Sequence, residues 1–158
     1  APEFVFHPFE LNPDMPPGGQ DIGEHIAEKY GSSPEERKSN GAMIRQRAAD
    51  VGFAMADRSD GRIYNTFDAH RLLHWAREDG KQLALKHRLF TAYFTDGEAP
   101  EDHDVLVRCA ADTGLDPEDL PAELLLELPQ VRQPALRLRL PRVPPVLGLE
   151  TGRSSELA

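Results

Sequence analysis

The chain has 158 residues, of which 39% are hydrophobic, and its formal net charge is −9 at pH 7. This length is enough for one domain with a modest core, and no apolar run approaches the roughly 18 residues of a membrane span. The negative charge opposes binding to nucleic acid, and a single cysteine excludes an intramolecular disulfide. Because the N-terminus lacks a signal-peptide pattern, we expect a cytoplasmic protein without a membrane partner.

The first third of the chain predicts one strand followed by two helices. PEFVFHPFEL has aromatic and β-branched residues in alternation, which indicates a strand at about residues 3–9, and NPDMPPGG then ends regular structure. A short amphipathic helix is predicted for residues 21–30. Ser33 and Pro34 make a strong start for the next helix, which should run to about residue 51.

Three helices with apolar faces are predicted in the middle of the chain. In NTFDAHRLLHWA, residues 65–76, apolar residues recur at helical spacing, and Asn65 or Thr66 is suited to cap the helix. KQLALKHRLFTAYFTDG follows after one glycine, so these two helices should pack antiparallel. EDHDVLVRCAADTGL gives the third helix, and Asp116 is suited to cap a further one. Most of the core is expected from Phe67, Leu72, Leu73, Trp75, Leu83, Leu89, Phe90, Tyr93, Phe94, Leu106 and Leu115.

The composition changes near residue 129. The segment 129–158 contains five prolines, five arginines and two acidic residues, and such a proline density opposes helices and central strands. We therefore divide the chain into a strand and turn at 1–14, a helical domain at 15–128 and an atypical tail at 129–158. A disordered extension, a basic arm for acidic partners, and a foreign or out-of-frame end are the alternatives for this tail.

Two features of the sequence are candidates for a metal-binding or reactive site. His70, His74 and Glu78 recur at intervals of four, which suits a metal ion on one helix face, but Arg71 stands where the H-E-x-x-H motif has its glutamate. A polar surface or interhelix role is more usual for such a histidine pair, so we predict neither a metal nor another cofactor. Cys109 lies on an apolar helix face and is expected to be a packed thiol with a raised pKa.

A resemblance to a known family covers residues 4 to about 126. It is carried, in the family's order and spacing, by HPFELNPDMPPGG, IAEKYGSSPEE, NTFDAHRLLHWA, RLFTAYFTDG and DHDVLVRCAADTGLD. These motifs resemble the DsbA-like thioredoxin-fold oxidoreductases, in particular the FrnE-like group, which is related to 2-hydroxychromene-2-carboxylate isomerases and kappa-class glutathione transferases. The resemblance implies a mainly α chain, the helical insertion domain of a DsbA-like thioredoxin fold, with one N-terminal strand and an incomplete thioredoxin-like part.

The resemblance also implies a function. Oxidoreductases of this family exchange dithiols and disulfides through a C-x-x-C motif, in which one thiolate attacks the substrate and the second resolves the mixed disulfide. No C-x-x-C is present here, so we predict no catalytic residue in this chain and expect exchange on protein or glutathione-like substrates only in a complete protein. A redox-silent helical binding module, or a relative of the isomerases and transferases, is the alternative.

The same resemblance places the turn at residues 8–13 and the helix start at residues 65–66 on the wall of the substrate cleft. The candidate residues for contact with a thiol or disulfide substrate are Pro8, Phe9, Asn12, Asn65 and Thr66. On their chemistry alone, Asn12 and Asn65 are equally well explained as turn and cap residues. An unpaired edge on the strand at residues 3–9 predicts a homodimer or association through that edge.

Overall fold

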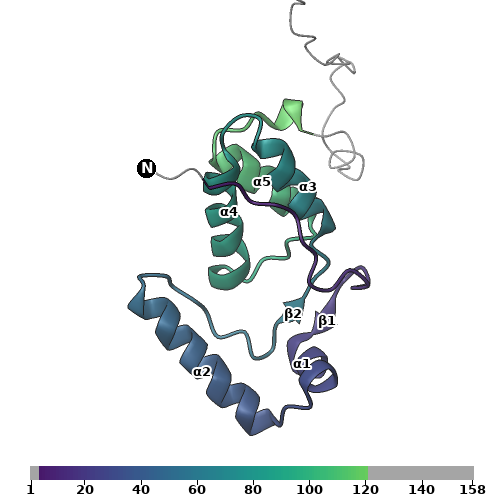
Figure 1. Cartoon of the computed structure of the whole chain (residues 1–158), viewed down its shortest axis with the longest axis vertical. Helices are drawn as coiled ribbons and strands as arrows, with labels where there is room; N and C mark the ends of the chain where they lie inside the picture. Colours follow the sequence, from purple (N-terminus) through teal and green to yellow (C-terminus); the bar gives the residue numbers. More distant parts are fainter. Residues whose placement is uncertain (1–3, 121–158) are drawn as a thin grey trace, which may run out of the picture.

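The computed structural model describes residues 4–120 and is mainly α-helical, as predicted. A bundle of three helices lies above a smaller unit of two helices and a short β ladder (Figure 1). The elements are β1 (Gln20–Asp21), α1 (Ile22–Tyr30), α2 (Pro34–Asp50), β2 (Arg62–Ile63), α3 (Phe67–Ala76), α4 (Gln82–Phe90), a π-helical turn (Thr91–Thr95), α5 (His103–Asp112) and a 3₁₀ turn (Pro117–Asp119).

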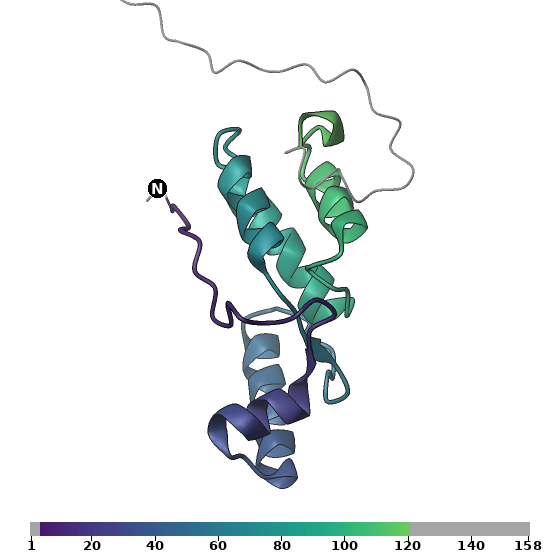
Figure 2. The same cartoon turned by 90° about the vertical axis from the view of Figure 1, so that its right-hand side faces the viewer.

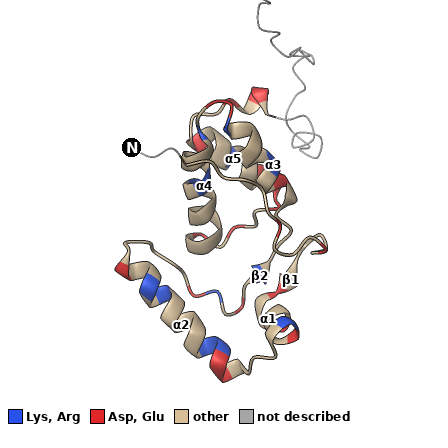
Figure 3. Cartoon of the chain, in the orientation of Figure 1, with Lys and Arg blue, Asp and Glu red and all other residues tan. Residues whose placement is uncertain are grey.

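Helices α1 and α2 begin where the sequence predicts, because each has a side chain that caps its first turn. Asp21 Oδ1 accepts a hydrogen bond from the Glu24 N–H at 2.9 Å. Ser33 and Glu36 form a reciprocal capping box at the start of α2. Within these two helices no residue is buried, and α2 carries charges of both signs along its length (Figure 3). Local interactions rather than burial therefore stabilise α2.

The β ladder connects the smaller unit to the chain that enters the bundle. Strands β1 and β2 pair antiparallel over two residues each. The Arg62 side chain donates from Nε to the Gly18 carbonyl at 2.7 Å and from a terminal nitrogen to the Gly19 carbonyl at 2.9 Å. A Cβ on Gly19 would clash with the Ile63 carbonyl oxygen. Glycine is therefore required where this turn meets β2.

The core lies where α3, α4 and α5 pack together (Figure 2). Helices α3 and α4 form the predicted antiparallel pair, and α5 packs against α4. The buried apolar residues of this cluster are Ala69, Leu72, Ala76, Leu85, Leu89, Ala92, Val105, Leu106, Cys109, Ala110, Leu115 and Leu120. The cluster contains small alanines as well as leucines, and the small side chains let the helices approach closely.

The predicted core is confirmed in part. Buried as predicted are Leu72, Leu89, Leu106 and Leu115, and half-buried are Leu73, Trp75, Tyr93 and Phe94. The assignment was wrong for Phe67, Leu83 and Phe90, which are 53%, 44% and 40% exposed. The buried stripe of α4 passes through Leu85 and Leu89, and each further residue along a helix turns by about 100°, so their bulky neighbours face elsewhere.

The strand predicted for residues 3–9 is not formed in its described part, residues 4–9. This segment runs beside α4 and is held at Phe6 by the buried side chain of Gln82. Gln82 Oε1 accepts from the Phe6 N–H at 3.0 Å, and Gln82 Nε2 donates to the Phe6 carbonyl at 2.9 Å. A strand needs the backbone of a neighbouring strand. Within the described residues, one side-chain amide takes its place.

Of the helix predicted after Asp116, the structure describes only the first residues. Asp116 Oδ1 accepts from the Glu118 N–H at 2.9 Å, as expected of a cap, and a 3₁₀ turn follows. The remainder of the predicted helix and the tail at 129–158 lie outside the described residues, and the three domain boundaries stay predictions. Of the helices in residues 4–120, none has the length and apolar composition needed to cross a bilayer.

We expect Leu106→Ala to lower the free energy of unfolding by about 2–5 kcal/mol, because this side chain is fully buried between α4 and α5. Phe90→Ala should cost about 1 kcal/mol, since its ring is partly exposed and its ring contacts are an edge contact with Phe94 and the Lys86 ammonium above it. Urea unfolding followed by circular dichroism measures both values. Equal losses in the two variants would contradict the observed core.

Candidate functional site

Asn65 joins the turn that precedes β1 to the start of α3. Its Nδ2 donates to the Met15 carbonyl at 3.0 Å, across 50 residues of sequence, and its Oδ1 accepts from the Phe67 N–H at 2.8 Å. Met15 is buried, and its own N–H donates to the Asn12 carbonyl at 3.1 Å. One side chain therefore caps α3 and fixes the turn at the same time.

Two further candidate residues lie at this junction. Asn12 Oδ1 accepts from Lys29 Nζ at 2.8 Å, which ties the turn to α1. Thr66 occupies the N-cap position of α3, but its side chain makes no capping hydrogen bond, and its carbonyl accepts from the His70 N–H. Of the two predicted caps, Asn65 is therefore the one that caps the helix with its side chain.

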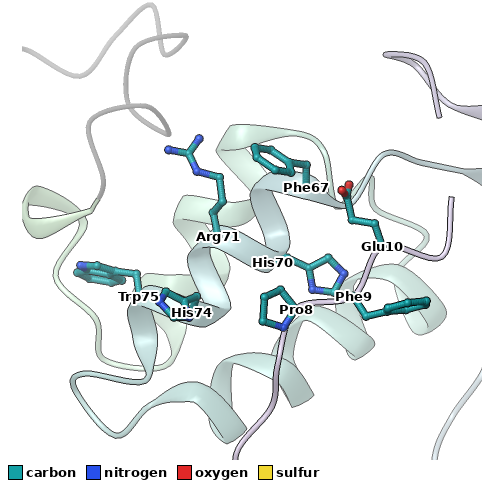
Figure 4. A pocket seen from close by; sticks show the side chains of 8 residues that line it. All are labelled: Pro8, Phe9, Glu10, Phe67, His70, Arg71, His74 and Trp75. Carbon is teal, nitrogen blue, oxygen red and sulfur yellow. The ribbon is translucent and has the colours of Figure 1, made fainter. Parts of the chain in front are cut away.

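A cavity of about 540 Å³ lies between α3 and residues 8–10. It is lined by Pro8, Phe9, Glu10, Phe67, His70, Arg71, His74 and Trp75. The His70 ring points toward the N-terminal segment, whereas the Arg71 side chain points away from that segment (Figure 4). Of the predicted substrate-contacting residues, Pro8 and Phe9 line this cavity, while Asn12, Asn65 and Thr66 lie at the neighbouring junction.

His70 is half-buried in the cavity wall. Burial lowers the pKa of its imidazole below the ordinary value of 6.5, and the charge of Lys86 acts in the same direction. The carboxylate of Glu10 and the backbone of Phe9 oppose this shift in pKa without cancelling it. At pH 7 the imidazole is therefore neutral, and it has both a nitrogen that donates and a nitrogen that accepts.

A chain of polar side chains connects the cavity edge to α5. An Arg71 guanidinium nitrogen lies 3.1 Å from Asp68 Oδ1, and His103 Nε2 lies 2.8 Å from Asp68 Oδ2. The Arg71 guanidinium also lies 5.6 Å from the centroid of the Phe67 ring. The positive charge at the cavity edge is thus compensated within the protein.

The sequence did not predict that α3 residues line a cavity. The two histidines four residues apart indicated either a metal site or a polar surface or interhelix pair, and neither interpretation points to a cavity wall. The third member of that column, Glu78, lies beyond Ala76, the last residue of α3. Among residues 4–120, no group of three or more His, Cys, Asp or Glu side chains is placed to hold a metal ion.

The model of the DSBA-like thioredoxin domain family matches residues 2–128, which include both the junction and the cavity. The chain belongs to this family. It also resembles the crystal structure of a probable DsbA oxidoreductase from Streptomyces coelicolor, with a TM-score of 0.64 and 31% identity over 75% of this chain and 51% of that one. This DsbA-like chain thus spans about half the length of that relative. No curated protein matches it.

Membership of the DsbA-like family confirms the predicted fold and the oxidoreductase family, and leaves the FrnE-like group a prediction. The one thiol of the chain is fully buried at Cys109, between α5 and the rest of the bundle. Burial raises the pKa of this thiol, and the charges of Arg88 and Arg108 only partly oppose the rise. Cys109 is therefore a packed thiol, as predicted, and stays protonated at neutral pH.

The lowered pKa of His70 predicts a loss of stability in mild acid. The unfolded chain binds a proton at His70 near pH 6.5, whereas the folded chain does so only at a lower pH. The stability contributed by neutral His70 should therefore be complete above about pH 6.5 and disappear as the pH falls through the folded-state pKa. Urea unfolding at pH 7.5, 6.5 and 5.5 should show this loss in the parent chain and a smaller one in His70→Asn.

The matched control for this pH series is His87→Asn, because His87 is exposed on α4 and outside the cavity. It should retain the pH dependence of the parent chain. If His70→Asn follows the parent chain at every pH, the burial of His70 does not affect its protonation and the prediction is wrong.

Asn65→Ala should lower the free energy of unfolding by about 1–3 kcal/mol, since it removes a helix cap and leaves the Met15 carbonyl without its donor. Thr66→Ala is the matched control and should be nearly neutral, because the Thr66 side chain makes no capping bond. Thermal unfolding of the two variants measures the difference in their stability. Similar melting temperatures for both would show that Asn65 is not the anchor of this junction.

Proposed function

We propose that this chain forms the helical part and an adjoining turn of a thiol-disulfide oxidoreductase of the FrnE-like group. The main support is the match of residues 2–128 to the DSBA-like thioredoxin domain. In this proposal a longer cytoplasmic protein exchanges dithiols and disulfides on protein or glutathione-like substrates. The chain supplies one wall of the cleft where the thiol meets its substrate.

Dithiol-disulfide exchange requires two reactive thiols, and the described core does not supply them. A thiolate attacks one sulfur of the substrate disulfide and displaces the other as a thiolate, and a second thiol then attacks the mixed disulfide and releases the reduced substrate. Cys109 is the single cysteine of the chain and is fully buried. It has no second thiol to resolve a mixed disulfide, so in this proposal the dithiol comes from a longer form of the protein.

The candidate residues suit the wall of such a cleft, some by lining it and one by holding it in place. Pro8 and Phe9 present apolar surface, and the imidazole of His70, which is hydrogen-bonded to the backbone of Phe9, adds a polar group beside them. Asn65 keeps this wall in place through Met15. In this arrangement Asn65 is a positioning residue, and the residues that line the cavity are the ones that meet the substrate.

A binding module without redox activity is the second candidate. It is favoured by the cavity beside α3, which is formed without a thiol among its lining residues. A relative of the isomerases or transferases would equally need no dithiol in this chain. The residue pair at the position of the family's C-x-x-C separates these possibilities from the oxidoreductase.

An insulin-reduction assay tests the proposal directly. We expect the 158-residue chain to leave the rate at its dithiothreitol-only value, and a version extended upstream to include a C-x-x-C to accelerate the reaction. Cys109→Ser should change neither result, because the buried thiol takes no part. Activity of the short chain that survives Cys109→Ser, or an inactive extended version with an intact C-x-x-C, would contradict the proposal.

The same assay tests the role of Asn65 in the extended version. If Asn65 positions the cleft wall, Asn65→Ala should lower turnover per folded molecule by more than Thr66→Ala does. Circular dichroism gives the folded fraction for this correction. Equal corrected turnover in the two variants would restrict Asn65 to its role as a cap.

A further inference from the structure

The chain has three asparagines, and one of them, Asn40, is followed directly by a glycine. The side-chain amide of an asparagine reacts with the backbone nitrogen of the next residue when the two meet, because the product is a five-membered succinimide ring. A glycine in the next position offers the least obstruction to this attack, since it has no side chain. The pair Asn40 and Gly41 therefore has the chemistry needed for spontaneous deamidation.

The other two asparagines are protected from this reaction by their surroundings. Asn12 precedes Pro13, whose backbone nitrogen has no proton to release. Asn65 precedes the β-branched Thr66, and both ends of its side-chain amide are engaged in hydrogen bonds. Within residues 4–120, by contrast, the exposed side chain of Asn40 makes no hydrogen bond. Asn40 is thus the reactive asparagine of the chain.

The position of Asn40 inside α2 controls the reaction. In an α-helix each backbone N–H donates to the carbonyl four residues earlier, so the Gly41 nitrogen is engaged while α2 is intact. Ring closure also requires a rotation about the ψ angle of Asn40 that the helical conformation does not allow. The nitrogen therefore reaches the side chain only when α2 opens at this point.

Helix α2 is weakly stabilised where Asn40 lies. None of its residues is buried, and it belongs to the smaller unit below the bundle (Figure 1). Ser39, Asn40 and Gly41 are three successive residues of low helix propensity, because the first two compete for backbone hydrogen bonds and glycine loses the most entropy on folding. The capping box ends at Glu36, more than one turn before Gly41. Opening at Asn40 is therefore expected within the folded protein.

We propose that Asn40 is a site of spontaneous deamidation whose rate is set by the opening of α2. When the helix opens, the Gly41 nitrogen attacks Cγ of Asn40. A bond forms between this nitrogen and Cγ, the bond between Cγ and Nδ2 breaks, and the Gly41 proton leaves with Nδ2 as ammonia. Water then opens the succinimide at either of its carbonyls, so the product at position 40 is aspartate or isoaspartate. The reaction needs no oxidant or reductant.

The isoaspartyl product interrupts α2. It has one additional carbon atom in the main chain, so the hydrogen bonds of the helix cannot continue through position 40. Because no residue of α2 is buried, the apolar cluster of the bundle stays intact. The modification therefore changes the smaller unit alone, and it is independent of the proposed oxidoreductase function.

Mass spectrometry of tryptic peptides measures the reaction, because cleavage after Lys38 and Arg45 isolates Asn40 in the peptide SNGAMIR. The 158-residue chain is kept at pH 7.5 and sampled with time, beside free SNGAMIR, in which no helix protects the site. We expect conversion of the amide to an acid in both. The chain should react at least about fivefold more slowly than the free peptide, since only the open helix reacts. Asn12 and Asn65 should be unchanged over the same period.

Glycine and alanine variants test whether opening of α2 sets the rate. Ala42→Gly lowers helix propensity beside the site and retains Asn40 and Gly41, so deamidation should be about fourfold faster. Ala111→Gly is the matched control, because it makes the same change at an exposed residue of α5 and should leave the rate unchanged. Gly41→Ala should react at least about fourfold more slowly. Its Cβ would lie at an ordinary contact distance of 3.4 Å from an Arg45 guanidinium nitrogen, so this variant should fold.

Several outcomes would overturn the proposal. An amide that is unchanged in the chain after many half-lives of the free peptide does so, as do equal rates in the chain and the free peptide. Equal rates in the parent and Ala42→Gly, or a faster reaction in Ala111→Gly, show that α2 does not set the rate. Similar conversion at Asn65 removes the special role of Gly41.

The products identify the route of the reaction. A protease that cleaves before aspartate but not before isoaspartate separates the two products, and we expect both. Aspartate alone would indicate direct hydrolysis of the amide without a succinimide and would also overturn the proposal. No thiol takes part in this test, so its result and that of the insulin assay are independent.

Discussion

The side-chain amide of Asn65 is the contact on which the arrangement of the candidate site depends. It binds the backbone at Met15 and at Phe67, so the turn before β1 and the start of α3 have a fixed relation. The segment at residues 8–10 lies between this junction and the amide of Gln82, which binds both backbone groups of Phe6. These two amides hold the segment on either side of the part that lines the cavity beside α3.

The side chains of Asn65 and Gln82 provide hydrogen bonds of the kind that a neighbouring strand provides in a β-sheet. Each forms a small number of hydrogen bonds, and a typical bond of this kind contributes about 0.5–1.5 kcal/mol net. The segment from Phe6 to Asn12 therefore depends on few interactions, whereas the bundle is stabilised by a continuous apolar cluster. The described part of this DsbA-like chain thus combines a well-packed helical bundle with a lightly held wall, and three of the candidate substrate contacts, Pro8, Phe9 and Asn12, lie on that wall.

The sequence predicted features that depend on neighbours along the chain. Caps at Asp21, Ser33 and Asn65 are local signals, and the helices they begin were placed correctly. The strand failed because its formation depends on a partner strand, which no local pattern supplies. The core prediction was wrong at bulky residues such as Phe90, because the size of a side chain does not show the direction in which it points. No local pattern predicted the contact made by Gln82, since its partner Phe6 lies 76 residues away.

Helix α2 has a consequence for the dynamics of the molecule. It has no buried residue, and its ion pair between Arg45 and Asp57, at 3.2 Å, is largely exposed and so contributes little. Because no residue of α2 is buried, burial couples this helix only weakly to the bundle, and we expect it to melt by fraying from its ends. Its amides should exchange with deuterium long before those of α5. On heating, helical signal should decline gradually before the cooperative transition of the bundle begins.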